Sequence, residues 1–135
     1  MEKMAPWTRP IFDVFEEYYA PDQIEYMIND NKVEVAPLAF MRGRTLDNAF
    51  VILDEAQNAT VPQMKMFLTR MGKHAKFIIT GDVSQVDLPR HQKSGLIESL
   101  ERLSNVEGIS VVRLTTTDVI RHRLVKKIIE AFETE

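Results

Sequence analysis

The chain from residue 33 onward alternates short apolar runs with helical patterns. The runs cover residues 33–36, 49–53, 76–80 and 109–114, and they are rich in β-branched and aromatic side chains. Between them, apolar residues recur every three or four positions, as on one face of an α-helix. This alternation predicts an α/β fold, a parallel sheet with helices on both faces. The near absence of polar residues in the runs is typical of strands buried on both sides.

The segment between the second and third runs predicts a helix with a defined start. Thr60 and Gln63 have the spacing of a capping box, and Pro62 stands in the first turn. The apolar face of this helix consists of Met64, Phe67, Leu68 and Met71. We expect these side chains in the core, and we expect Gly72 to end the helix.

Other parts of the chain also show helical periodicity. The pattern predicts one helix through Leu96, Ile97, Leu100 and Leu103, and a last one after Asp118 whose core face holds Ile120, Leu124, Ile128 and Phe132. Before the sheet, two short helices are predicted, separated at Ala20-Pro21. Trp7, Tyr18 and Tyr19 could stack on nucleic-acid bases, but their apolar surroundings favour packing against the sheet.

Composition narrows the class of protein. The 135 residues, 44% hydrophobic and 27% charged, suit one folded domain. The chain has no cysteine, which excludes disulfides, thiolate zinc sites and cysteine nucleophiles. It has no long apolar run and no signal-peptide pattern, so we expect a cytoplasmic protein without a membrane segment. The net charge of -3 gives no overall attraction to nucleic acid.

Two adjacent carboxylates follow the second apolar run. Asp54 and Glu55 would stand at the carboxyl edge of the sheet, where open α/β sheets bind ligands. Asp54 could hold Mg²⁺, and Glu55 could orient or deprotonate an attacking water. The alternative is that both residues begin a solvated loop. The chain contains no Gly-x-x-x-x-Gly-Lys-Ser/Thr phosphate loop, so it has only part of an ATPase site.

The next apolar run ends in a second polar cluster, residues 80–89. Gly81 allows positive φ or a close backbone approach, and Asp82 follows it directly. Gln85 could reach a terminal phosphate or its attacking water, as glutamines do in other nucleotide hydrolases. The two clusters are therefore expected at neighbouring positions on one edge of the sheet.

These segments carry a family resemblance. Residues 51–58 (VILDEAQN), 80–89 (TGDVSQVDLP) and 118–122 (DVIRH), together with 9–13 and 41–46, resemble the PhoH-like ATPase family, relatives of superfamily 1 helicases. The resemblance implies a RecA-like P-loop NTPase core, ATP with Mg²⁺, ring-shaped homo-oligomers and a role in RNA unwinding or RNA metabolism. It makes Asp54 the Walker B magnesium aspartate, Glu55 the catalytic glutamate, Gln85 the sensor of the terminal phosphate and Arg121 the arginine finger. Gly81 and Asp82 would line the nucleotide.

The chain departs from this family in lacking the glycine-rich loop. We therefore expect residues 1–135 to form the C-terminal portion of a single PhoH-like domain, with a sheet incomplete because the phosphate-loop strand is missing. The chain would be a fragment, a truncated product or a split subunit, inactive alone, and another chain could supply the loop. The alternative function is a non-enzymatic interaction or assembly module that has lost ATP binding.

Basic and histidine residues add weaker signals. Arg42 and Arg44 flank a glycine, and the pattern leaves open whether they are solvated or contact a polynucleotide such as RNA or single-stranded DNA. Lys126 and Lys127 are interpreted as the solvated face of the last helix. The histidines, His74, His91 and His122, are scattered without metal-ligand spacing and are interpreted as structural or surface residues.

Overall fold

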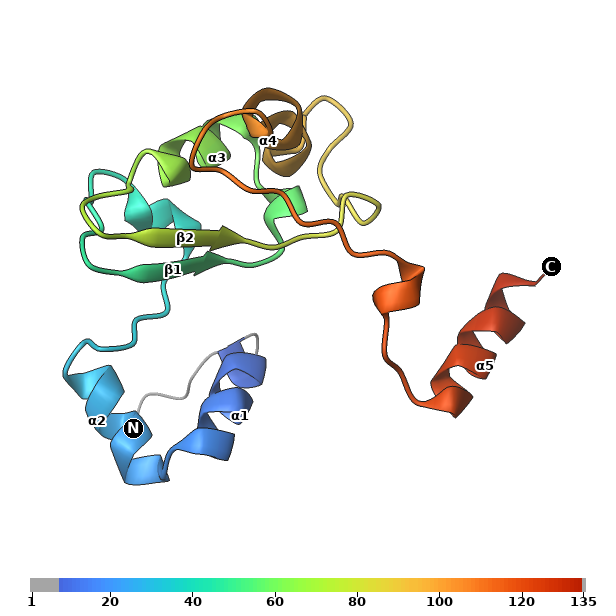
Figure 1. The fold of residues 1–135 in the computed structure, drawn as a ribbon, viewed down its shortest axis with the longest axis horizontal. Coiled ribbons are helices and arrows are strands. Elements are labelled where there is room, and N and C mark those ends of the chain that lie inside the picture. The colour runs from blue at the N-terminus through green and yellow to red at the C-terminus, as the bar shows by residue number, and fades with distance from the viewer. Residues whose placement is uncertain (1–7, 135) are drawn as a thin grey trace.

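The computed structural model describes residues 8–134 (Figure 1). The elements follow in the order α1 (Arg9–Tyr18), α2 (Pro21–Asn29), the 3-10 helix η2 (Leu38–Met41), β1 (Phe50–Leu53), the 3-10 helix η3 (Ala56–Asn58), α3 (Val61–Leu68), β2 (Lys76–Ile79), α4 (Gly95–Leu103), the 3-10 helix η4 (Thr116–Asp118) and α5 (Arg123–Glu133). The α/β class and every predicted helix region are confirmed. The expectation for Trp7 lies outside the described residues.

The sheet consists of β1 and β2, which pair in parallel from Phe50 opposite Lys76 to Leu53 opposite Ile79. Helix α3 makes the crossover between them. The prediction of strands at 33–36 and 109–114 is wrong for this structure. An extended segment becomes a strand only when a neighbouring edge accepts its hydrogen bonds. Residues 109–114 find no such edge, and Val112 and Leu114 remain 83% and 78% exposed.

Only one face of the sheet is covered within residues 8–134. Alternate side chains point to opposite faces, so Leu53 and Ile79 share the covered face and both pack against the core. On that face the rings of Phe77 and Phe67 have centroids 5.0 Å apart. On the other face, Phe50 and Ile52 are 65% and 61% exposed. The expectation of helices on both faces is therefore wrong here, and Figure 1 shows α3 and α4 on the same side.

The core lies between the sheet, α3 and α4. Ala56, Ala59 and Met64 are buried at its centre, and Leu38, Leu53, Leu68, Ile79 and Leu96 pack around them. Gly95 lets the start of α4 pack closely against α3. A Cβ at this position would stand 2.6 Å from both the Met64 Cβ and the Thr60 carbonyl oxygen, which is too close for any other residue to fit without a shift. The core positions predicted for Met64, Phe67 and Leu68 are thus confirmed. The core position predicted for Met71 is wrong, because α3 ends at Leu68 and Met71 is 52% exposed.

The start of α3 agrees with the predicted capping box. The Thr60 hydroxyl accepts a hydrogen bond from the Gln63 backbone N–H at 3.3 Å, and the Gln63 side chain accepts one from the Thr60 N–H at 2.9 Å. The predicted end is wrong, because α3 ends at Leu68. Gly72 instead allows a close approach: its own N–H donates to the Leu46 carbonyl, and a Cβ would clash with the Asp47 side chain.

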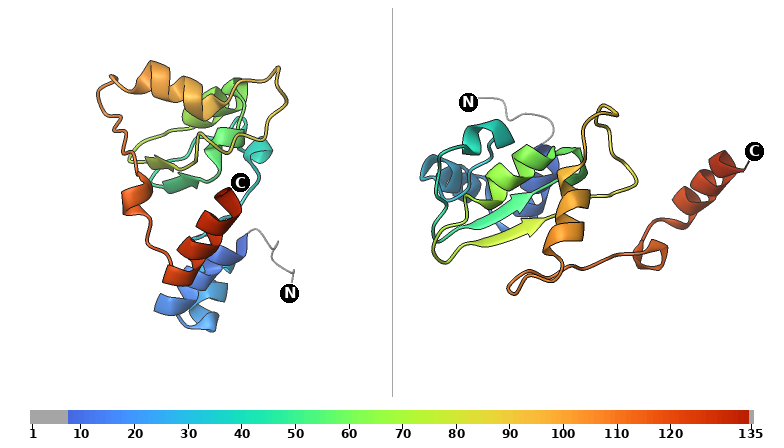
Figure 2. Two further views of the ribbon diagram at one scale, coloured as in Figure 1. Left: turned by 90° about the vertical axis from the view of Figure 1, so that its right-hand side faces the viewer. Right: turned by 90° about the horizontal axis from the view of Figure 1, so that it is seen from above.

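Helices α1 and α2 on one side and α5 on the other stand away from the sheet, as Figure 1 and the left-hand view of Figure 2 show. Helices α1 and α2 form a hairpin whose interior buries Phe12 and Ile24, while Tyr18 and Tyr19 are exposed. The expectation that these tyrosines pack against the sheet is wrong, because the hairpin closes on Phe12 and Ile24 and turns them outward. Ile120 precedes α5 and is 97% exposed, so the predicted core face of the last helix is also wrong. None of the helices within residues 8–134 is long and apolar enough to cross a membrane.

Candidate functional site at the carboxyl edge of the sheet

Asp54 follows the last residue of β1, and Thr80 follows the last residue of β2. The Thr80 N–H donates to the Leu53 carbonyl at 2.9 Å, and the Ala56 N–H donates to the Thr80 carbonyl at 3.0 Å. The Thr80 hydroxyl donates to Asp54 Oδ1, also at 2.9 Å. Parallel pairing therefore places the two predicted polar clusters side by side, and a strand-to-strand hydrogen bond fixes the Asp54 carboxylate.

Glu55 has a left-handed backbone conformation, with φ 53° and ψ 38°. A side chain other than glycine adopts this conformation at a cost of about 1 kcal/mol or more, and such strain concentrates at functional sites. The Glu55 N–H donates to Asp54 Oδ1 at 2.9 Å, which holds the turn closed. The two adjacent carboxylates have different partners, because Asp54 accepts from the Thr80 hydroxyl and Glu55 from the Gln57 amide.

Gln57 organises this edge, although its place in the sequence indicated no role. Its side chain is 1% exposed, its Nε2 donates to Glu55 Oε2, and its Oε1 accepts from the Asp82 N–H at 3.1 Å. One buried amide thus joins the loop after β1 to the loop after β2. The signal that could have identified Gln57 is its place beside alanines that are buried. A buried amide needs partners for both its donor and its acceptor, so a glutamine there would be expected to make hydrogen bonds.

Gly81 makes the close approach expected of it. A Cβ on Gly81 would lie 2.7 Å from Gln57 Oε1 and 2.7 Å from Leu96 Cδ2. A larger residue would push the loop after β2 away from Gln57. Close packing between the two loops therefore needs glycine at this position, whereas its contact with a nucleotide remains a prediction.

Asp82 organises the loop that follows Gly81. Its Oδ1 accepts from the Ser84 hydroxyl at 2.6 Å and from the Ser84 N–H at 2.9 Å, and these hydrogen bonds lower the pKa of the Asp82 carboxyl. The Gln85 N–H donates to the Asp82 carbonyl at 3.1 Å. The Gln85 side chain is exposed and makes no hydrogen bond within residues 8–134, so it is available to a ligand.

A second amide ties the far end of the same loop. Asn58 Oδ1 accepts from the Asp87 N–H at 2.7 Å, which returns the loop to the residues after β1. Asn58, like Gln57, received no role from the sequence. Both side chains act by positioning the loop that carries Asp82 and Gln85.

The donor set suits a magnesium ion held indirectly. Asp54 Oδ1 accepts two hydrogen bonds, and Oδ2 accepts none within the described residues, leaving an exposed oxygen at the sheet edge. No group of three or more Asp, Glu or His side chains gathers as a metal site in residues 8–134. Mg²⁺ commonly keeps several waters and binds through one or two carboxylates plus substrate phosphates. Asp54 therefore suits a magnesium ion that keeps most of its water ligands, and does not suit a site built only from protein side chains.

Arg121 lies in the segment between η4 and α5 and is exposed. It makes no hydrogen bond or ion pair within residues 8–134, so the structure does not tie it to Asp54, Glu55 or Gln85.

Arg44, by contrast, donates to both carboxylate oxygens of Glu34 at 2.8 and 2.9 Å. These hydrogen bonds lower the pKa of Glu34 and raise that of Arg44.

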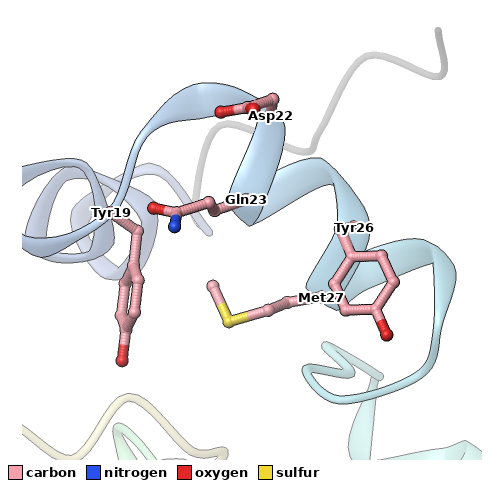
Figure 3. Close-up of a pocket in the computed structure, with 5 residues that line it drawn as sticks. All are labelled: Tyr19, Asp22, Gln23, Tyr26 and Met27. Atoms are coloured by element: carbon pink, nitrogen blue, oxygen red, sulfur yellow. The ribbon is translucent and has the colours of Figure 1, made fainter.

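Two surface cavities lie away from this edge. One, of about 340 Å³, is on the α1–α2 hairpin, where Figure 3 shows Met27 and Gln23 between the rings of Tyr19 and Tyr26, with Asp22 above them. The other, of about 440 Å³, is lined by the start of α3, residues 91–93 and Glu98. Neither is lined by Asp54 or Glu55.

The structure is of the mixed α/β class: a parallel β-crossover-β unit carries an Asp-Glu pair at its carboxyl edge, the edge at which open α/β sheets bind ligands. The family model described as "PhoH-like protein" matches residues 1–133. The chain therefore belongs to the PhoH-like family of P-loop NTPases, whose members bind ATP.

Several curated relatives are similar over nearly the whole chain. A PhoH-like protein of Bacillus subtilis (strain 168) is 54% identical over 134 residues, which make up 99% of this chain and 42% of the relative. A PhoH-like protein of Synechocystis sp. is 52% identical over 98% of the chain and 40% of its own length. Protein PhoH of Escherichia coli (strain K12) is 46% identical over 97% of the chain and 38% of its own length. The chain thus spans about two fifths of these relatives.

Proposed function

We propose that this chain carries the carboxylate half of a magnesium-dependent ATP-hydrolysing site, in a protein of RNA metabolism or RNA unwinding. The observation that carries the proposal is the arrangement at the sheet edge. Thr80 holds Asp54, the strained Glu55 turn presents a second carboxylate, and Gln57 connects that turn to the loop of Asp82 and Gln85.

Each residue then has a distinct role. Asp54 binds the magnesium ion through its water ligands, and Glu55 orients or deprotonates the attacking water. The exposed Gln85 side chain senses the terminal phosphate, with Gly81 and Asp82 alongside the nucleotide. Magnesium supplies charge neutralisation on the phosphates when it is bound.

The unpaired segments support a second part of the proposal, a partner segment that carries the phosphate loop. Residues 109–114 are mostly apolar and form no strand pair, and one sheet face exposes Phe50 and Ile52. Such surfaces gain stability when another strand and its helices cover them. We propose that this partner contributes the phosphate-binding backbone N–H groups, and that Arg121 acts across a homo-oligomeric ring on a neighbour's nucleotide.

The experiment is equilibrium binding of a slowly hydrolysed ATP analogue with Mg²⁺. It compares the 135-residue chain with a longer chain that includes a family phosphate loop, each beside Asp54→Ala. Asp87→Ala is the matched control, because Asp87 lies in the neighbouring loop and only its backbone N–H bonds to Asn58. We expect binding by the longer chain that Asp54→Ala weakens at least about tenfold and Asp87→Ala leaves unchanged.

The remaining outcomes separate the alternatives. Binding to the 135-residue chain that Asp54→Ala abolishes would mean that this edge suffices without a phosphate loop. No binding by either chain would refute the ATPase proposal and favour a non-enzymatic assembly module. Adding a single-stranded RNA oligonucleotide to the longer chain tests the RNA part separately, through a change in its rate of ATP hydrolysis.

A further inference from the structure

Gln57 is a buried polar side chain between the two loops of the carboxyl edge. It is 1% exposed, whereas Glu55, two residues before it, is exposed. No buried side-chain nitrogen or oxygen in the described part of the chain lacks a hydrogen-bond partner. A buried amide satisfies its polar atoms inside the protein rather than with bulk water, so its partners restrict how it can turn.

The Asp82 N–H decides which way the Gln57 amide faces. The two ends of an amide differ, because its oxygen only accepts hydrogen bonds and its nitrogen only donates them. A backbone N–H only donates, so the Asp82 N–H, 3.1 Å from Gln57 Oε1, selects the oxygen end. The Nε2 end is then turned toward the loop after β1, where it donates to Glu55 Oε2.

The turn that carries this N–H is itself held in place. Asp82 Oδ1 accepts hydrogen bonds from the Ser84 hydroxyl and the Ser84 N–H. Gly81 lets the turn approach, because a Cβ there would lie 2.7 Å from Gln57 Oε1. The orientation of the Gln57 amide therefore depends on the loop after β2, although its donor acts on the loop after β1.

Glu55 is held at two points, one on its backbone and one on its side chain. Its N–H donates to Asp54 Oδ1, which fixes the left-handed turn. Its Oε2 accepts from Gln57 Nε2, and its Oε1 accepts no hydrogen bond within residues 8–134. A carboxylate held in this way offers one oxygen to a ligand in a defined position, and such positioning contributes strongly to reaction rates.

We infer that Gln57 is a positioning residue for the proposed hydrolysis: it holds Glu55 by Oε2 and leaves Oε1 as the oxygen that acts on the attacking water. This role rests on the proposed function and assigns a task to each oxygen of Glu55. Oε1 takes one proton from the water, whose oxygen forms a bond to the terminal phosphorus. The bond from that phosphorus to the bridging oxygen breaks, and its electron pair leaves on ADP. Gln57 keeps both of its amide protons throughout.

The kinetic experiment uses the longer chain with a family phosphate loop. Gln57→Met keeps the length and approximate volume of the side chain but removes the amide. We expect kcat to fall at least about tenfold, because Glu55 is no longer held. The Kd of a slowly hydrolysed ATP analogue should change less than about twofold, since Asp54 and the phosphate loop remain.

A double-mutant cycle with Glu55 separates positioning from general damage. If Gln57 acts through Glu55, Gln57→Met should lower the residual rate of Glu55→Ala less than about twofold. The matched control is Gln92→Met, the same change at an exposed glutamine, which should leave kcat unchanged. Circular dichroism checks that each variant keeps its helices.

A measurement without nucleotide tests the hydrogen bond directly in the 135-residue chain. Glu55→Ala should shift the NMR signals of the Gln57 side-chain amide and speed its hydrogen exchange, because its acceptor is lost. The backbone amide signal of Asp82 should stay in place, since its bond to Gln57 Oε1 is kept. The side-chain amide of Gln92 is the internal control.

Three results would count against this role, and they differ from one another. A fall in kcat that is equal with and without Glu55 would show that Gln57 only supports the fold, and would overturn the inference. Gln57 amide signals that Glu55→Ala leaves unmoved would overturn it as well. A longer chain that hydrolyses no ATP would refute the proposed function itself, and this role of Gln57 with it.

Discussion

The region built from β1, α3, β2 and α4 differs from the two ends of the chain in how it treats apolar side chains. In the central region Met64 and Phe67 are each 2% exposed. At the ends, Tyr18 and Phe132 are 75% and 87% exposed, although they also belong to amphipathic helices. Amphipathic helices of similar pattern thus bury their apolar face in the central region and leave it exposed at the two ends.

This difference separates two kinds of functional residue. Asp54, Glu55 and Gln57 lie beside the core, and hydrogen bonds within the chain already define their arrangement. Arg121 lies near an uncovered helix and has no bonded partner in residues 8–134. The carboxylate edge is therefore organised by the chain itself, whereas the proposed role of Arg121 depends on assembly.

The largest expected effect is on the central core. Met64→Ala should lower the free energy of unfolding by about 2–5 kcal/mol, because it leaves a cavity among Ala56, Ala59 and Leu96. Phe132→Ala, measured in dilute solution, should change it by less than about 0.5 kcal/mol. Urea denaturation checks both variants. Equal losses would mean that α5 packs in the monomer and would remove the contrast between the regions.

The next effect concerns Gln57. Gln57→Leu leaves the Asp82 N–H and the Glu55 carboxylate without their buried partner, and it should cost about 1–3 kcal/mol. The same change at the exposed Gln92 should be nearly neutral. Denaturation gives the stability, and the amide NMR signal of Asp82 reports the lost hydrogen bond. An unmoved Asp82 signal would show that the two loops are joined by other contacts.

Helix capping tests the comparison on a smaller scale. Thr60→Ala should cost about 1 kcal/mol, because the start of α3 is packed against α4 and its cap restrains a stable helix. Thr115→Ala removes a hydroxyl at the start of η4 that bonds only to the side chains of Thr117 and Asp118. The residues of η4 are exposed, so this change should cost less than about 0.5 kcal/mol. Thermal unfolding of both variants is the measurement, and an equal loss would show that η4 also carries stability.

The smallest effect is at Glu34, in the link between the hairpin and the sheet. Arg44→Gln should raise the pKa of Glu34 toward its ordinary value of 4.5, because the hydrogen bonds from the guanidinium are lost. A surface ion pair contributes less than about 1 kcal/mol. Because the folded pKa is lowered, this stabilisation is present above pH 4.5 and is lost as the pH falls through the lowered value.

NMR titration of Glu34 in Arg44→Gln, beside Arg42→Gln as control, checks this. Arg42 makes no hydrogen bond or ion pair in residues 8–134, so its replacement should leave the Glu34 pKa unchanged. A similar shift in both variants would mean that general charge, rather than the bidentate pair, lowers the pKa of Glu34.

The features that could be predicted were local ones. The capping box at Thr60 and the place of Asp54 after β1 followed from spacing within a few residues, and the parallel pair β1–β2 followed from the alternation of apolar runs with a helical pattern. The strands expected at 33–36 and 109–114 were wrong, because an apolar run shows the capacity to pair and not the presence of a partner edge. The core face expected for α5 failed for the same reason.

The sequence by itself therefore determined the family, the central helices and strands, and the residues at the carboxyl edge, because periodicity and caps depend on near neighbours. Only the tertiary structure decided that Gln57 reaches across the chain to the Asp82 N–H, that Glu55 adopts a left-handed turn, and that one sheet face and α5 remain open. Those features depend on which distant segments meet, and hydrophobic pattern alone does not specify the partner.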